Sequence, residues 1–231
     1  MSDTALVVMA RYPEVGATKT RLARVIGGGE AVLLYRAFLT DLAERFAGQG
    51  YDLHWTYTPN GVDYSAFMAT LAPSLVQRMR SFPQQGAELG ARLHHAFEWT
   101  YERGYRRTIV IGSDSPHISR DIVARAREAL NVADVVLGPA DDGGYYLIAM
   151  WRPHDVFHGI PMSTSQVMQM TVELAQRQEF GMPHVFGTVF CQQLPDERQG
   201  FPEMEAPRQV CFKPHVRPPD ILPHFPVEGV F

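Results

Sequence analysis

Short apolar runs recur along the first three quarters of the chain and predict its strands. Residues 5–10, 108–111 and 133–137 are largely apolar and rich in β-branched side chains, as is typical of strands covered on both faces. Residues 52–58 alternate in polarity, and residues 145–150 are again strand-like. Several of these runs lead through a loop into a helical pattern, so the repeating unit is strand, loop and helix.

Apolar residues at helical spacing predict helices between the strands. The expected helices cover residues 30–46, 64–71, 84–103, 119–130 and 163–179, and residues 75–80 and 185–190 are compatible with further strands. Ser119 is a plausible N-cap, and the residues from Ser163 to Gln166 have the form of a capping box. The expected inward residues of the first and third helices are Leu34, Phe38, Leu42 and Phe46, and Leu89, Leu93, Ala96, Phe97 and Tyr101.

Length and charge narrow the function classes. A chain of 231 residues favours one domain, 1–231, in which seven prolines beyond residue 195 predict an irregular tail over 195–231. The net charge of -4 argues against nucleic-acid partners. The N-terminus lacks the features of a signal peptide and no run is long enough to span a membrane, so we expect a cytoplasmic protein. The tail is compatible with an arm in a homodimer.

The sharpest candidate for chemistry is Asp114, which follows the apolar run 108–111 within the turn Gly112-Ser113-Asp114-Ser115-Pro116. In open α/β sheets, ligands bind outside the carboxyl ends of the strands, which is where this carboxylate would lie. A second candidate is the loop that follows residues 5–10. It holds Arg11, Gly16, Lys19 and Arg21 and could hold phosphate oxygens, although a solvated basic loop is an equal alternative.

Two further segments carry polar side chains near expected strand or helix ends. Asp142, in the sequence Asp-Asp-Gly-Gly after residues 133–137, could share a divalent cation with Asp114, but the same residues could form a simple hairpin turn. Gln85, Glu88 and Arg92 precede or open the helix over 84–103. They could meet a ligand or form a solvated helix end.

Four motifs in one order carry a resemblance to a known family. They are Arg11-x-Pro-x-x-Gly-x-x-Lys-Thr-Arg-Leu22, Gln85-Gly with Leu89-Gly-x-Arg92, Ile111-Gly-Ser-Asp-Ser-Pro116, and Gly138-Pro-Ala-Asp-Asp-Gly-Gly-Tyr-Tyr146. Over about residues 5–179 the chain resembles a bacterial family of uncharacterised proteins with a glycosyltransferase-A (GT-A) fold. That family is similar to 2-phospholactate guanylyltransferases and, more distantly, to molybdenum-cofactor guanylyltransferases.

The resemblance implies a three-layer α/β/α fold of the nucleotide-diphospho-sugar transferase (GT-A) type, with a mostly parallel central sheet. It also implies a site for a nucleotide and for Mg (or Mn) at Asp114, with Asp142 assisting; Asp114, Asp142 and Lys19 are then the expected catalytic residues. The nucleotide-binding residues that it implies are Ala10, Arg11, Gly16, Lys19, Arg21, Gln85, Gly86, Arg92 and Ser113.

The chain departs from the pattern of the family at three places. Sugar transferases of this fold usually carry Asp-x-Asp where this chain has Ser113-Asp114-Ser115. Met162 stands where relatives tend to have Trp, and an Asp-Val-Asp-Thr-Pro-like stretch near the C-terminus is absent. The identity of a second metal ligand is therefore left open.

Three functions follow as alternatives. The first is a Mg-dependent glycosyltransferase that uses a nucleotide-sugar donor and a small acceptor. The second is a guanylyltransferase-like nucleotidyltransferase acting on a small phosphorylated acceptor, which the Lys-Thr-Arg-Leu sequence favours. The third is a nucleotide-binding protein without catalysis, which the missing acidic stretch favours.

Overall fold

Six strands form one sheet in the order β3-β2-β1-β4-β6-β5. The structure is a computed structural model that describes residues 2–140, 142–162 and 164–177. β1 to β4 are mutually parallel, whereas β6 is antiparallel to both of its neighbours. The strands are β1 (Thr4–Arg11), β2 (Asp52–Thr58), β3 (Met79–Pro83), β4 (Arg107–Gly112), β5 (Val135–Pro139) and β6 (Tyr145–Met150).

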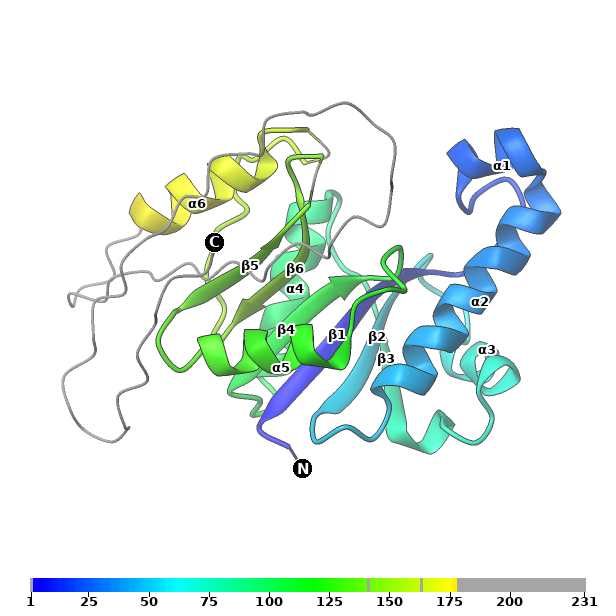
Figure 1. Cartoon of the computed structure of the whole chain (residues 1–231), viewed down its shortest axis with the longest axis horizontal. Coiled ribbons are helices and arrows are strands. Elements are labelled where there is room, and N and C mark those ends of the chain that lie inside the picture. The colour runs from blue at the N-terminus through cyan, green and yellow to red at the C-terminus, as the bar shows by residue number, and fades with distance from the viewer. Residues whose placement is uncertain (1, 141, 163, 178–231) are drawn as a thin grey trace.

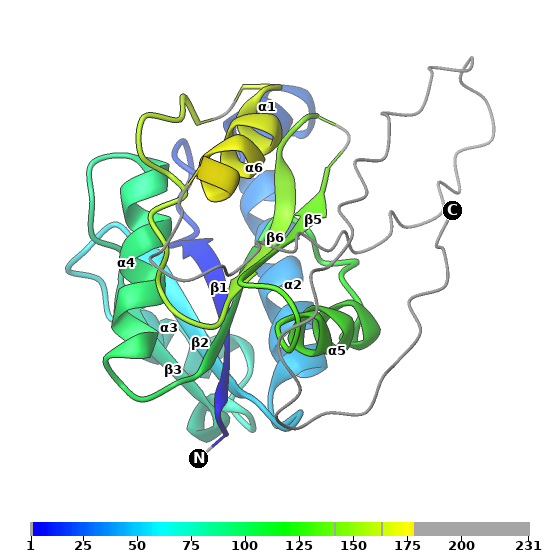
Figure 2. The same ribbon diagram turned by 90° about the vertical axis from the view of Figure 1, so that its left-hand side faces the viewer.

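Helices cover both faces of this sheet (Figures 1 and 2). α2 (Gly28–Phe46), α3 (Tyr64–Leu71) and α5 (Arg120–Ala129) pack on one face, and α4 (Leu89–Tyr101) and α6 (Val167–Arg177) pack on the other. A 3-10 helix (Val76–Arg78) leads into β3. The expected three-layer α/β/α fold with a mostly parallel sheet is confirmed.

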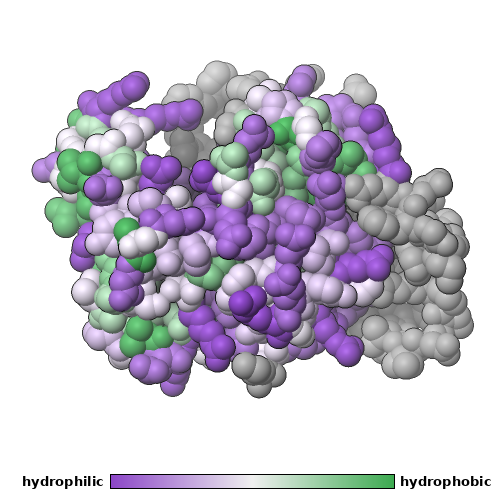
Figure 3. Space-filling view, turned by 180° about the vertical axis from the view of Figure 1, so that it is seen from behind, coloured by the Kyte–Doolittle hydropathy of each residue, from purple (hydrophilic) through white to green (hydrophobic). Residues whose placement is uncertain are grey.

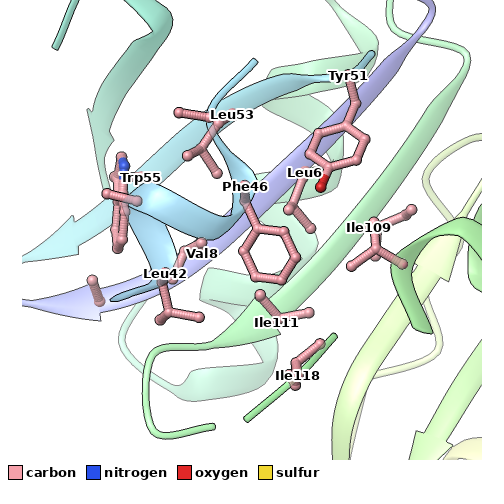
Figure 4. Close-up of a cluster of buried hydrophobic side chains, with 14 of the residues drawn as sticks. Leu6, Val8, Leu42, Phe46, Tyr51, Leu53, Trp55, Ile109, Ile111 and Ile118 are labelled. Carbon is pink, nitrogen blue, oxygen red and sulfur yellow. The ribbon is translucent and has the colours of Figure 1, made fainter. Parts of the chain in front are cut away.

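The alternation of side chains along the central strands gives the sheet two separate cores. Leu6 and Val8 of β1 face α2, α3 and α5, where they join a cluster with Phe46 and Trp55 (Figure 4). Ala5 and Val7 of the same strand belong to the cluster under α4. Because successive side chains of a strand point to opposite faces, a strand buried on both must be apolar throughout.

Several local predictions are confirmed and others are wrong. The Ser119 side chain accepts a hydrogen bond from Ile122 N and caps α5, as expected. Of the expected inward residues of α2, Leu42 and Phe46 are buried and Phe38 packs against the core, whereas Leu34 is exposed. Tyr35 and Leu39, which were not expected, are buried as well. α4 likewise buries Gly90 and Thr100 rather than its terminal residues Leu89 and Tyr101, which are exposed.

Two element boundaries also differ from expectation. The strand expected over 75–80 begins at Met79, because residues 76–78 form the 3-10 helix. The predicted strand at 185–190 and the proline-rich tail at 195–231 lie outside the described residues, and so does Ser163 of the expected capping box. Over the described ranges, no helix is both long and apolar enough to cross a membrane.

A short helix that the sequence did not predict, α1 (Thr20–Ile26), projects with the first turns of α2 beyond the edge of the sheet (Figure 1). None of its residues is buried. Apolar side chains are exposed in this region, including Val15, Val25 and Leu33, and apolar surface is visible there in Figure 3 at the upper left. The loop that follows β1 is therefore connected to a helix, α1, whose side chains are accessible to solvent.

Candidate functional site

The carboxyl ends of five parallel strands, β1 to β5, meet at one edge of the sheet, and the predicted site residues follow them. Arg11 pairs with Thr58 at the ends of β1 and β2, and Met9 pairs with Gly112 at the end of β4. The segments after β1 and β4 are therefore neighbours, although about a hundred positions separate them in the chain. This edge is where ligands bind in open α/β sheets.

The loop after β1 is held in a compact turn by its own side chains. Thr18 Oγ1 accepts a hydrogen bond from Glu14 N at 2.8 Å and donates one to Tyr12 O at 3.3 Å. Arg11 Nη1 donates to Ala17 O at 3.2 Å. Gly16 has a φ of 84°, a conformation that glycine adopts without steric cost.

Lys19 ends this loop in an unusual backbone conformation and reaches Asp114. Its φ of 50° makes it the one non-glycine residue with positive φ among the described residues. Its Nζ lies 2.6 Å from Asp114 Oδ1. The ammonium also lies 5.5 Å from the ring centroid of Tyr35 and 5.7 Å from that of Phe38, both on α2, within the range of cation–π attraction.

The two members of this ion pair differ in exposure. The Lys19 side chain is 19% exposed and the Asp114 side chain is 71% exposed. The lysine is thus held against the protein by the rings, whereas the carboxylate faces solvent with one oxygen on the ammonium. An arriving ligand can therefore reach Asp114 directly.

Tyr35 joins the ends of β1 and β4 and was not predicted as a site residue. Its hydroxyl accepts a hydrogen bond from Arg11 N at 3.0 Å and lies 2.7 Å from Ser113 Oγ. Burial is the main reason that the pKa of Tyr35 is raised from its ordinary value. A neutral phenol keeps its proton, so it can donate to Ser113 while it accepts from Arg11.

Gln84 was also missed, because the sequence drew attention to Gln85. The buried Gln84 Nε2 donates to Ala10 O at 3.1 Å and to Thr56 O at 3.0 Å, which ties β3 to the ends of β1 and β2. The Ala10 carbonyl therefore has a partner within the protein. Gln85, by contrast, is exposed.

Arg92 closes the loop between β3 and α4. Its guanidinium donates to Gly86 O at 3.0 Å and to Ala87 O at 3.2 Å. Gly86 has a φ of 120°, and a Cβ there would come within 2.7 Å of Ala91 Cβ. These residues shape the loop, and their role toward a nucleotide stays a prediction.

Residues 142–144 of the Asp-Asp-Gly-Gly sequence lie in the hairpin between β5 and β6, as in one of the two interpretations of the sequence. Asp142 is exposed, and its Oδ1 accepts a hydrogen bond from Gly144 N at 3.0 Å. Gly143 packs on the start of α6, where its carbonyl accepts from Met168 N at 3.0 Å. A Cβ on Gly143 would lie 2.1 Å from Ser165 O, so only glycine fits this contact.

Asp114 and Asp142 lie on the same edge of the sheet with β6 between their strands. Neighbouring strands are about 4.8 Å apart, so the ends of β4 and β5 are separated by about 10 Å. Within the described ranges no three His, Cys, Asp or Glu side chains gather into a group that could hold a metal ion. Magnesium commonly binds one or two carboxylates and completes its shell with water and substrate phosphates, and the exposed Asp114 carboxylate fits that kind of site.

Comparison with known proteins places the chain among bacterial relatives. Residues 42–164 match the family described as "Uncharacterized protein conserved in bacteria (DUF2064)". No curated protein matches the sequence. A solved structure from Desulfovibrio desulfuricans G20, provisionally named a nucleotide-diphospho-sugar transferase, is 34% identical, with a TM-score of 0.72 over 83% of this chain and 80% of that chain.

A more distant structural neighbour is the 4-diphosphocytidyl-2C-methyl-D-erythritol synthase from Anaerococcus prevotii DSM 20548. It is 9% identical, with a TM-score of 0.48 over 82% of this chain and 87% of that chain. The Desulfovibrio relative confirms the nucleotide-diphospho-sugar transferase type of fold that the motifs implied. With a family match over more than half of its length and a relative of this similarity, the chain belongs to the DUF2064 family.

Proposed function

We propose that the protein is a nucleotide-dependent transferase that uses a nucleotide-diphospho-sugar donor together with Mg (or Mn) and transfers the sugar to a small acceptor. The observation that carries this proposal is the contact between Lys19 Nζ and Asp114 Oδ1 at the carboxyl edge of the sheet. This contact brings a cationic loop and a carboxylate together. The cations suit the oxygens of a diphosphate, and the carboxylate suits the metal that accompanies it. The name given to the Desulfovibrio relative supports the same class of donor.

Each charged residue has a distinct role in this proposal. Lys19 and Arg21, with Arg11, bind the oxygens of the donor diphosphate, and Asp114 holds the metal, with Asp142 assisting from the β5–β6 hairpin. When bound, the metal acts as a Lewis acid that stabilises charge on the departing diphosphate. The Tyr35 hydroxyl keeps the loops after β1 and β4 in register, so that these groups converge on one ligand.

A second candidate is nucleotidyl transfer, including the guanylyltransferase-like reaction. The loop cations favour it, because Lys19 and Arg21 would stabilise charge at an α-phosphate under attack by a phosphorylated acceptor. In that reaction the acceptor oxygen bonds to the α-phosphorus while pyrophosphate departs with the electron pair.

A third candidate is nucleotide binding without catalysis. It is favoured by the departure of the sequence from the pattern of the family, since the sequence lacks the Asp-Val-Asp-Thr-Pro-like stretch. It predicts a ligand-induced rise in stability and no product.

A thermal-shift panel separates these candidates, because a ligand that binds only the folded state raises the melting midpoint. The panel contains nucleoside triphosphates, diphosphates and nucleotide-sugars, each with and without Mg. A larger shift with one nucleotide-sugar, followed by release of its nucleoside diphosphate when an acceptor is added, supports glycosyl transfer. A triphosphate that exceeds every nucleotide-sugar supports nucleotidyl transfer. No shift with any compound contradicts all three.

The role of Asp114 is tested by Asp114→Asn, with Asp41→Asn as the control, because Asp41 is an exposed aspartate on α2. Asp114→Asn is expected to lose the Mg-dependent part of the shift and of turnover. Its stability should change by less than about 1 kcal/mol, since the Asp114 side chain itself is largely exposed. Metal-dependent turnover that persists in Asp114→Asn would exclude the metal role.

A further inference from the structure

We infer that Lys19 is a built-in competitor of the metal at Asp114 and thereby sets the metal affinity of the site. This inference rests on the proposed function, in which Asp114 holds a divalent cation. The inference goes beyond that function because it gives Lys19 two roles: the lysine competes with the metal for Asp114, and it binds the phosphates.

The first support is the position of the ammonium. Lys19 Nζ lies 2.6 Å from Asp114 Oδ1, which is the distance of a direct ion pair on a carboxylate oxygen. A divalent ion bound to that oxygen would stand within a few ångströms of the ammonium. Two cations at such a distance repel each other, so one carboxylate does not hold both at full strength.

The second support is that the lysine is held in place rather than free to move away. The backbone of Lys19 itself has a left-handed conformation (φ 50°, ψ 45°), and its ammonium lies against the rings of Tyr35 and Phe38. Tyr35 is itself fixed by its bonds to Arg11 N and Ser113 Oγ. The aromatic support reduces the entropy that an exposed lysine ordinarily loses when it pairs.

The third support is the lack of reinforcement on the carboxylate side. Asp114 has serine on both sides, and the described part of the chain gathers no group of three metal-ligating side chains. When one carboxylate is the main ligand of a metal ion, pairing of that carboxylate with Lys19 lowers the metal affinity strongly. Phosphate oxygens that bind the Lys19 ammonium would release Asp114 for the metal. Phosphate binding would therefore strengthen metal binding, and metal binding would strengthen phosphate binding.

The experiment measures Mn²⁺ alone, without nucleotide, by the electron paramagnetic resonance signal of free Mn²⁺ in a titration of the full chain. Lys19→Met is expected to bind Mn²⁺ about tenfold more tightly than the wild type, as the electrostatic cost of a neighbouring charge in a partly solvated site suggests. Lys19→Arg keeps the charge and should stay near the wild type. Asp114→Asn, alone or combined with Lys19→Met, should lose this Mn²⁺ ion.

Arg24→Met is the matched control, because it removes an exposed cation of the neighbouring helix α1 that has no part in the proposed site. It should change the Mn²⁺ affinity by less than about twofold, as expected for a screened surface charge. Lys19→Gly removes the ammonium and suits the left-handed backbone, so it tests the charge without stressing the fold. Circular dichroism melts verify that each variant is folded.

Mn²⁺ binding that is unchanged or weaker in both Lys19→Met and Lys19→Gly would overturn the inference. An equal gain in Arg24→Met would overturn it too, because the effect would then be one of general charge. Failure of this inference can be distinguished from failure of the proposed function. Tighter Mn²⁺ binding in Lys19→Met alongside a negative nucleotide panel refutes the function alone, whereas a positive, Mg-dependent panel with no Lys19 effect refutes the competition alone.

Discussion

The hydroxyl of Tyr35 lies 2.7 Å from Ser113 Oγ, although the two residues are 78 positions apart in the chain. The same hydroxyl accepts from Arg11 N. One phenol on α2 therefore fixes the distance between the loop that follows β1 and the turn that carries Asp114.

Removal of that hydroxyl should loosen both loops. Tyr35→Phe leaves Arg11 N and Ser113 Oγ without their partner, which is expected to lower the free energy of unfolding by about 1–3 kcal/mol. Ser113→Ala should cost less, because it removes only one hydrogen-bond partner of Tyr35 and leaves Tyr35 and Arg11 paired. Denaturant melts of both single variants and of the double variant measure the coupling, and costs that simply add would contradict a direct bond.

The buried amide of Gln84 predicts a pH-dependent effect of Gln84→Glu. A carboxylate would face the carbonyl oxygens of Ala10 and Thr56, to which the amide nitrogen now donates. Its pKa would rise above the ordinary value near 4.3, so the folded state would hold a proton that the unfolded state has lost. The variant should therefore lose stability as the pH rises above about 4.3, reaching about 3 kcal/mol at pH 7.

Gln85→Glu is the control for this substitution, since it makes the same change at the exposed neighbouring position. Its stability relative to the wild type should stay within about 0.5 kcal/mol from pH 4 to pH 7. Parallel pH curves for the two glutamate variants would contradict the role given to Gln84.

Gly143 should tolerate no side chain. Its φ is 82°, and an added Cβ would lie 2.1 Å from Ser165 O, a backbone atom two residues before α6. Gly61 serves as the comparison, because it has a similar φ of 91° and nothing within 4 Å of an added Cβ. Gly61→Ala therefore measures the backbone cost alone, about 1–2 kcal/mol. Gly143→Ala should cost clearly more in thermal melts, and equal costs would show that the contact with α6 yields easily.

His54 should make the protein less stable in acid. Tyr105 donates its hydroxyl proton to Asp52 Oδ2, so His54 Nε2 must be the donor toward Tyr105, and Nδ1 has no partner among the described residues. Burial lowers the pKa of His54 from 6.5 to about 4. Between these values the unfolded chain binds a proton that the folded protein excludes, so stability present above pH 6.5 is lost as the pH falls to 4.

The loss from His54 amounts to at most about 3 kcal/mol, and His154 contributes with the same sign because burial also lowers its pKa to about 4. His54→Gln keeps a donor toward Tyr105 and cannot titrate. Its unfolding free energy should therefore fall less steeply between pH 6.5 and pH 4. A slope equal to that of the wild type would show that His54 is not the titrating group.

Much of the fold could be predicted because the central strands are buried on both faces and are therefore apolar throughout. Residues 5–10 and 108–111 stand out for that reason and correspond to β1 and β4. The strand that corresponds to β3 was predicted to begin at residue 75 rather than at Met79. Its sequence mixes polar and apolar residues without a clear pattern, and pairing with β2 stabilises it. α1 was missed because it buries no residue, so no apolar periodicity marks it.

The candidate site divides in the same way. Charged residues such as Lys19 and Asp114 could be named from strand-end positions and motifs, and the structure brings these two together. Tyr35 and Gln84 could not, because their roles depend on contacts between segments far apart in the sequence. A tyrosine within a helix and one of two consecutive glutamines carry no local signal that distinguishes them.

The strand order has a consequence for synthesis on the ribosome. β1 pairs on one side with β2 and on the other with β4, whose residues are made about a hundred positions later. Until residues 107–112 emerge, the nascent chain holds the apolar strand β1 with one edge unpaired, the arrangement that invites association between chains. Chaperone binding to ribosome-bound chains should therefore decline once β4 has emerged.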